Sequence, residues 1–163
     1  PLSSLSIAKR QLSSCILRTG SMATKTQRLD TLPHYVPQRA TGFAIIERAR
    51  QGVNTQRVDQ LTQLLGLSLK EMAALLQIAE RTLHRFRSEG RLDQQASERL
   101  LLLDNLAAHG LQVFDDRADA LADWLRYPLR ELQSQTPFQL LTTISGFNLV
   151  DDVLTRIEYG VYS

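Results

Sequence analysis

Hydrophobic side chains recur at intervals of three and four residues along most of the chain after Thr41, which is the spacing of amphipathic helices. The first such group ends at Gly52 and consists of Phe43, Ile45, Ile46 and Ala49. No stretch of useful length alternates with the period of two that half-buried strands require. The pattern therefore predicts an all-α protein.

Start and stop residues divide this pattern into separate helices. Asn54 or Thr55 can cap a helix that Gly66 ends, and Ser68 with Glu71 forms a capping box before a helix over 69–76. Further helices are predicted over about 80–88, 94–108, 118–126, 137–141 and 149–158, with stops at Gly90 and Pro128 and with Gly146 just ahead of the last.

Charged and aromatic residues have structural roles in this scheme. We expect Asp115 and Asp116 to cap the 118–126 helix, and Asp151 and Asp152 to lie near the start of the last one, where acids suit the helix dipole. Large aromatic residues at helical spacing usually belong to the core. The residues expected there are Phe114, Trp124 and Phe138.

The leader over 1–40 differs from the rest of the chain: its first 33 residues are basic and rich in Ser and Thr, with a possible short helix over 5–17. Gly20-Ser21-Met22 resembles a cloning remnant ahead of a true start at Met22, so we leave 1–21 out of the functional argument. Residues 22–40 are expected to be a flexible arm.

Residues 69–87, LKEMAALLQIAERTLHRFR, are typical of a helix-turn-helix. Ala73 is small where the second helix crosses the first, Ile78 can plug the turn, and Leu83 with Phe86 forms the stripe to be buried. The remaining polar side chains of the second helix can reach base edges and phosphates in a major groove. These candidate DNA-binding residues are Arg81, Thr82, His84, Arg85 and Arg87.

An ordinary αα-hairpin in a helical bundle remains an alternative for this segment. Gln77 stands where the turn usually has Gly, so it would need a left-handed conformation. Ala79 stands where Ser or Asn usually caps the second helix. Three arginines and a histidine on one short helix nevertheless favour DNA binding.

Composition limits the other classes of function. The chain has 163 residues, 43% hydrophobic, with no apolar run long enough to span a membrane. Cys15 is the single cysteine, and the three histidines show no ligand spacing. We therefore expect no disulfide, metal or cofactor, and a cytoplasmic location. With no nucleophile–base pair or phosphate loop recognisable, we expect the protein not to be an enzyme.

The net charge of +2 hides a strong asymmetry. Residues 1–29 contain five basic residues and no acid, and 68–91 contain five against three acids. Residues 92–163 instead contain five arginines against eleven Asp and Glu. A basic front and an acidic back indicate different partners for the two halves, although solvated faces without a special role would give the same pattern.

The second half of the chain resembles the Xre/MbcA/ParS-type antitoxins, in particular the Xre-type partners of RES-domain toxins. The segments that carry the resemblance are RTLHRF (81–86), RLDQQASERLLLL (91–103), VFDD (113–116), ALADWL (120–125) before Pro128, TPFQLL (136–141), Gly146 and VLTRIEYGVYS (153–163). Residues 132–135, LQSQ, depart from the family, which commonly has a Gly-Gly-Arg-like loop before Thr-Pro.

This resemblance implies an antitoxin that represses its own operon through a helix-turn-helix and neutralises a toxin that degrades NAD. It implies an Xre/Cro-like bundle over 41–91 and a small helical domain over 92–163 for dimerisation and toxin binding. The C-terminus then plugs the toxin's active site, because a terminal carboxylate and two tyrosines suit an arginine-lined pocket. The candidate toxin-binding residues are Arg156, Glu158, Tyr159, Gly160, Val161, Tyr162 and Ser163.

The expected partners are thus a RES-domain toxin, operator DNA and a second copy of the chain. One recognition helix of mixed charge binds DNA weakly, and dimers on paired half-sites overcome this weakness. The successive leucines at 100–103 offer more apolar surface than one face can bury, so the 94–108 helix is expected to serve both the core and a dimer seam. A stand-alone helix-turn-helix repressor without a toxin partner is the alternative.

Overall fold

The computed structural model describes residues 39–160, and their regular secondary structure is helical apart from two isolated backbone bridges. The elements are α2 (Gly42–Gln51), α3 (Gln56–Leu64), α4 (Leu69–Leu76), α5 (Glu80–Glu89), α6 (Gln94–Val113), α7 (Ala118–Arg126), the 3-10 turn η2 (Arg130–Leu132), α8 (Pro137–Leu140) and α9 (Ile144–Tyr159). The all-α prediction is confirmed for these residues. The predicted helix over 5–17, the predicted arm up to residue 38, and Val161, Tyr162 and Ser163 lie outside the described part.

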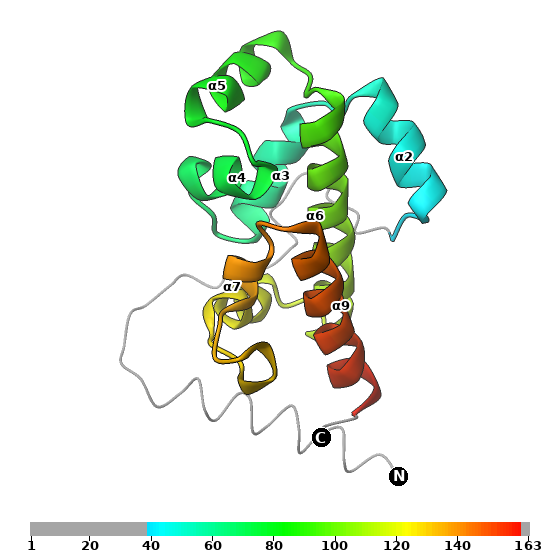
Figure 1. Ribbon diagram of the computed structural model, residues 1–163, viewed down its shortest axis with the longest axis vertical. Coiled ribbons are helices and arrows are strands. Elements are labelled where there is room, and N and C mark those ends of the chain that lie inside the picture. Colours follow the sequence, from blue (N-terminus) through cyan, green and yellow to red (C-terminus); the bar gives the residue numbers. More distant parts are fainter. Residues whose placement is uncertain (1–38, 161–163) are drawn as a thin grey trace.

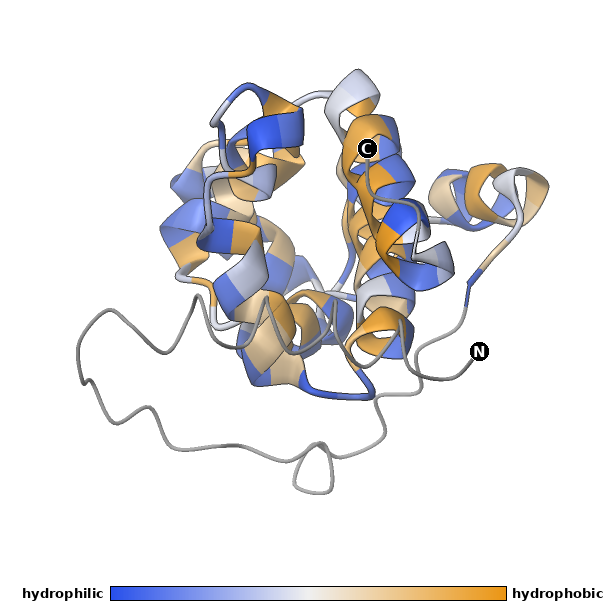
Figure 2. Ribbon diagram, turned by 90° about the horizontal axis from the view of Figure 1, so that it is seen from below, coloured by the Kyte–Doolittle hydropathy of each residue, from blue (hydrophilic) through white to orange (hydrophobic). Residues whose placement is uncertain are grey.

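Helix α6 is the axis of the molecule (Figure 1). Around its N-terminal half, α2 packs on one side and α3–α5 lie on the other, while α7, α8 and α9 surround its C-terminal half. Hydrophobic residues line the inward faces of these helices, and hydrophilic ones lie outside (Figure 2). One continuous core therefore joins the two halves of the chain.

The length of α6 depends on Gly110. The pattern predicts an end near Ala108, but the helix continues to Val113 with Gly110 inside it. A Cβ on Gly110 would lie 2.5 Å from a methyl carbon of Leu121, so this glycine permits the close approach of α7. Its role is in helix packing, and the predicted helix end was wrong.

Gly146 likewise lies inside a helix rather than before it. Thr143 caps α9 by accepting a hydrogen bond from the Gly146 amide at 3.0 Å. A Cβ on Gly146 would overlap the carbonyl of Leu140, so only glycine allows α8 and α9 to meet at this angle. Because α9 begins at Ile144, Asp151 and Asp152 fall in its middle, and the prediction that they lie near its start was wrong.

The expected cap of α7 was also wrong. Asp115 and Asp116 adopt left-handed conformations, with φ of 53° and 59°, and turn the chain between α6 and α7. The residue at the cap is Arg117, which makes no side-chain cap hydrogen bond, and the acid in the first turn is Asp119.

The expected core aromatics pack as proposed. Trp124 is buried, and its ring lies 5.8 Å from that of Phe114. Phe114 and Phe138 are half-buried against the core.

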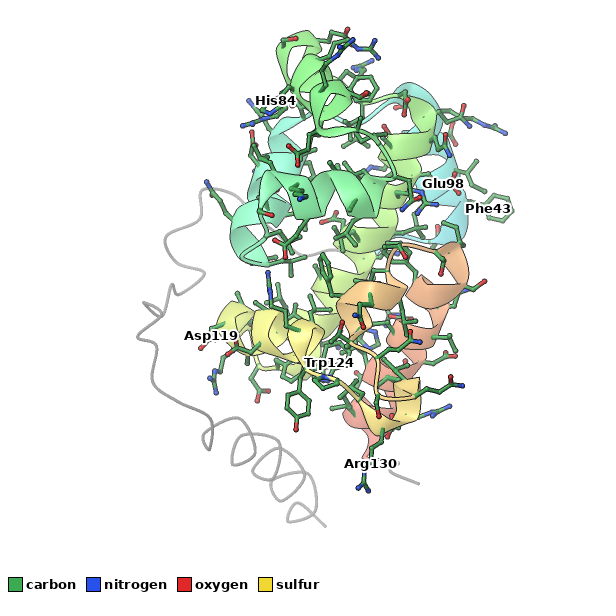
Figure 3. All side chains as sticks on the ribbon, turned by 60° about the vertical axis from the view of Figure 1, so that its left-hand side comes forward. Phe43, His84, Glu98, Asp119, Trp124 and Arg130 are labelled. Carbon is green, nitrogen blue, oxygen red and sulfur yellow. The ribbon has the colours of Figure 1, made fainter. Side chains whose placement is uncertain are left out.

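Two expectations about apolar surface were wrong. Leu100, Leu101 and Leu103 are buried within the chain and Leu102 is half-buried, since helices surround α6 on most sides; α6 therefore has no spare leucine face for a dimer seam. On α2, only Ile45 and Ala49 of the expected apolar face are buried. Phe43 is 87% exposed and points away from the molecule (Figure 3), because α2 packs mainly against α6 and buries one narrow stripe.

The loop before α8 keeps a glycine-like backbone without glycine. Gln133 and Ser134 adopt positive φ values of 55° and 62°. The Ser134 amide donates to the Leu129 carbonyl at 2.9 Å, and the Leu129 amide donates to the Gln135 carbonyl at 3.1 Å. These backbone bonds hold the loop in a conformation that side-chain-bearing residues rarely adopt.

Gly146→Ala is expected to destabilise the protein by about 1–3 kcal/mol, because the added methyl group overlaps a backbone carbonyl that cannot move alone. Gly42→Ala is the matched control, since Gly42 is also helical and a Cβ there meets nothing within 4 Å. Urea unfolding of both variants checks this. If Gly146→Ala were as stable as the wild type, the contact between α8 and α9 would be looser than described.

Candidate functional site

The helix-turn-helix is formed by α4, a three-residue turn and α5. Ser68 and Glu71 make the predicted capping box: the Ser68 amide donates to the Glu71 carboxylate at 2.7 Å, and the Glu71 amide donates to the Ser68 hydroxyl at 3.2 Å. The hydrogen bond that the Ser68 amide donates to the Glu71 carboxylate is the main reason why the pKa of Glu71 lies below its ordinary value. The first helix thus begins at a fixed residue.

The turn has the strained residue that the sequence predicts. Gln77 is left-handed, with φ of 58° and ψ of 40°, and the Ile78 amide donates to the Ala73 carbonyl at 3.0 Å. Ala79 stands at the cap of α5 without a side-chain cap hydrogen bond. Backbone bonds and the packing of half-buried Ile78 against the core therefore set the angle between α4 and α5.

Helix α5 buries one stripe and exposes the opposite one. Leu83 and Phe86 are buried. Arg81, His84 and Arg85 are exposed and share the opposite face, since they are three and four residues apart. Figure 3 shows His84 pointing outward from α5. Ser88, which the sequence argument missed, lies on the same face, as its spacing of seven residues from Arg81 indicates.

The other two candidates lie on the flanks of this face. Arg87 is bound to Asp59 of α3 at 2.9 Å, and Thr82 is half-buried. Arg85 forms an exposed ion pair with Glu89 at 3.5 Å and lies 5.3 Å from the centre of the Phe86 ring. We name the set Arg81, His84, Arg85 and Ser88 the outer face of α5.

Four of the candidate toxin-binding residues, Arg156, Glu158, Tyr159 and Gly160, lie at the end of α9. Arg156 is exposed, and Tyr159 is 73% exposed. Gly160 ends the helix in a left-handed conformation with φ of 68°. Glu158 differs, because its carboxylate lies 3.3 Å from Nε2 of the buried His109. In the last turn of α9, Arg156 and Tyr159 are therefore exposed, whereas Glu158 contacts the buried His109.

Sequence reasoning missed His109. It comes from α6, is fully buried, and lies between two carboxylates of α9, with Asp151 2.6 Å from Nδ1. Asp151 in turn lies 3.4 Å from the guanidinium of Arg39. The only signal in the sequence was the spacing of seven residues between Asp151 and Glu158, which places them on one helix face.

Two arginines help to hold the helix-turn-helix region to the rest of the chain. Arg57 of α3 binds both carboxylate oxygens of buried Asp104 on α6, at 2.7 Å each. Arg126 of α7 donates to the carbonyls of Leu65 and Gly66, at 3.3 and 2.9 Å. In Figure 1, α5 lies near one end of the long axis and the end of α9 at the other.

No helix in the described stretch is long and apolar enough to cross a membrane. Within residues 39–160, no group of three His, Cys, Asp or Glu side chains is placed to hold a metal ion.

Two family models match the chain, one for each half. Residues 44–103 match the antitoxin Xre-like helix-turn-helix domain. Residues 109–160 match the antitoxin Xre/MbcA/ParS C-terminal toxin-binding domain. The two matched stretches meet within α6 and leave little of the described chain outside them.

Curated relatives and a solved structure agree with these matches. An antitoxin Xre of Yersinia enterocolitica (serotype O:8 / biotype 1B) is 24% identical over 123 residues, which cover 75% of this chain and 83% of the relative. An antitoxin Xre of Photorhabdus laumondii is 31% identical over 75 residues, or 46% of this chain and 51% of the relative. The crystal structure of the M. tuberculosis MbcT–MbcA toxin–antitoxin complex contains a similar fold, with a TM-score of 0.54 at 21% identity over 67% of this chain and 96% of that chain.

Asp151 is expected to make stability depend on acid pH. The hydrogen bond from His109, then the charges of His109 and Arg39, hold its pKa below the ordinary value of 3.8, against the opposing effect of burial. The stabilisation that ionised Asp151 gives the folded protein is therefore fully present above pH 3.8. It is lost as the pH falls through the lowered pKa of Asp151 in the folded state.

Asp151→Asn removes this titration, so the wild type should be the more stable protein at neutral pH and should lose that advantage as the pH falls below 3.8. Urea unfolding at several pH values measures the difference. Asp152→Asn is the matched control, since Asp152 is exposed on the same helix with no ion pair among the described residues. A constant difference between wild type and Asp151→Asn across this range would show that the pKa is not lowered.

Proposed function

Because the chain belongs to the Xre/MbcA/ParS family of antitoxins, we propose that it neutralises a RES-type, NAD-degrading toxin and represses its own operon. In this proposal the C-terminal segment enters the toxin's active site, and the outer face of α5 binds operator DNA.

The exposed end of α9 is the observation that carries the toxin-binding half of the proposal. The last turn presents Arg156 and Tyr159, and Gly160 releases the chain from the helix toward Val161, Tyr162 and Ser163. Tyrosines are good anchors at protein interfaces because they combine apolar area with a hydroxyl group. A site that binds the pyrophosphate of NAD needs basic groups, and tyrosine hydroxyls can accept hydrogen bonds from them.

Charge supports the same assignment of partners. The acidic residues of 92–163 outnumber the arginines by eleven to five, so this half of the chain attracts a basic surface. The five basic residues against three acids of 68–91 suit phosphates instead.

The outer face of α5 supports the proposal for DNA binding. Arg81 and His84 make no ion pair within the described chain, and the pair between Arg85 and Glu89 is exposed, so all three can turn to a nucleic acid at little cost. Arg87 and Thr82 lie at the edges of this face, where they suit contacts with phosphates. We also propose that the protein binds DNA as a dimer, since the few charges of one copy give weak binding.

In this proposal, the two binding activities belong to different parts of the chain. We assign DNA binding to 41–91 and toxin binding to 92–163, with α6 shared by the core of both parts. The two surfaces lie far apart (Figure 1), so we expect each activity to survive the loss of the other.

A chain that ends at Glu158 is expected to lose its protective effect. Bacteria that co-express the neighbouring gene of the same operon should recover growth and cellular NAD only with the full-length chain. Recovery with both chains would place inhibition in the body of the C-terminal half. A neighbour that is harmless alone and leaves NAD unchanged would favour the stand-alone repressor.

Replacing Arg81 and Arg85 together by alanine is expected to weaken operator binding at least about tenfold, since each arginine contributes phosphate or base contacts. The matched control is the double variant of Arg48 and Arg50, which are exposed on α2. Gel-shift titration at fixed salt measures the affinity, and light scattering of the complex gives the number of copies. Loss of toxin neutralisation in the α5 variant would show that the two roles are not separable.

A further inference from the structure

His109 is the most buried ionisable contact between α6 and α9. Its side chain has no solvent exposure, while the carboxylates on either side of its ring are 39% and 31% exposed. Asp151 faces Nδ1 at 2.6 Å and Glu158 faces Nε2 at 3.3 Å. We name these three residues the His109 clamp.

Both ring nitrogens of His109 face a carboxylate oxygen, so the imidazole ties two positions of α9 to α6. Ionised carboxylates only accept hydrogen bonds, and each imidazole N–H can serve one of them. The guanidinium of Arg39 lies 3.4 Å from Asp151 and gives that carboxylate a second partner. A buried polar group that loses its partner is costly, so these contacts resist separation of the two helices.

The clamp acts on the part of α9 that precedes the toxin-binding segment. Asp151 and Glu158 are seven residues apart, two helical turns, so one ring holds both ends of this stretch against α6. Glu158 directly precedes Tyr159 and the helix-ending Gly160. The last turn has little other packing, because Ile157 is its one buried side chain.

We propose that His109 is a positioning residue for toxin binding: it fixes the last turn of α9, and with it the orientation of Tyr159 and of the helix-ending Gly160. It has no exposed atoms with which to touch the toxin, so it acts through Glu158. This inference rests on the proposed function, since it gives the clamp a role in toxin binding.

The free chain gives the first test. Amide hydrogen exchange of the last turn should become at least about tenfold faster in Glu158→Ala, because helix ends open locally when their anchors are lost. His109→Gln should do the same, since its amide can serve only one carboxylate well. Asp152→Asn is the matched control and should leave exchange unchanged. Uniformly faster exchange over all of α6 and α9, or no change in the last turn, would overturn the local role.

The second test is a thermodynamic cycle on toxin binding. His109→Gln should weaken binding of the neighbouring gene product about tenfold in the full-length chain, an ordinary coupling energy for residues that act together. In a chain that ends at Glu158, the same substitution should change the affinity less than about twofold. Equal losses in both backgrounds would mean that His109 serves only the fold, and would overturn the proposal.

The wild-type measurement separates this inference from the function on which it rests. If the full-length wild type does not bind the neighbouring protein at all, the proposed function fails, and the role of His109 in toxin binding fails with it. If the wild type binds and only the cycle shows no coupling, the inference alone fails. Operator binding by His109→Gln should equal that of the wild type, because the clamp lies far from α5.

Discussion

Burial of α6 is the constraint on which the rest of the structure depends. Along its 20 residues, side chains on most sides are buried, and α2, α4, α7 and α9 all pack against it. A buried leucine contributes about 1.5–3 kcal/mol relative to an exposed one, so the leucines of α6 alone supply a large share of the folding energy. Because one helix runs through both halves, neither half has a core of its own.

Polar residues of α6 set the position of each element on this apolar axis. Ser97 accepts from the Val53 amide after α2 at 2.9 Å, and Asp104 binds Arg57 of α3. Asn105 binds the amide and the carbonyl of Ala40, and His109 binds α9. Leucine packing alone tolerates sliding, whereas a buried polar group left without its partner costs about 1–3 kcal/mol. These contacts therefore specify register more than they add stability.

This arrangement explains how a small antitoxin keeps two surfaces apart. The outer face of α5 and the end of α9 lie near opposite ends of the long axis, and the core between them fixes their relative orientation. The outer face of α5 runs along that helix and the other surface lies at the last turn of α9, and both helices bury the stripe that faces the core. The charge asymmetry of the sequence follows the same axis, with basic residues on α5 and acids in the C-terminal half.

The sequence by itself determined the helices and the turn of the helix-turn-helix, because these depend on local spacing and capping. The capping box at Ser68, the left-handed Gln77 and the outward arginines of α5 were all predictable in this way. The resemblance to the antitoxin family also rested on short motifs that the chain carries.

Only the tertiary structure decided what glycines and buried polar residues do. The pattern ended one helix at 108, before Gly110, and began another after Gly146, yet each glycine lies inside a helix at a point where a neighbouring element comes too close for a Cβ. His109 looked like an isolated histidine, since its partners are 42 and 49 residues away and reach it only when α6 and α9 pack. A local pattern cannot show which distant segment fills a given face, and that choice is made by the packing of the whole chain.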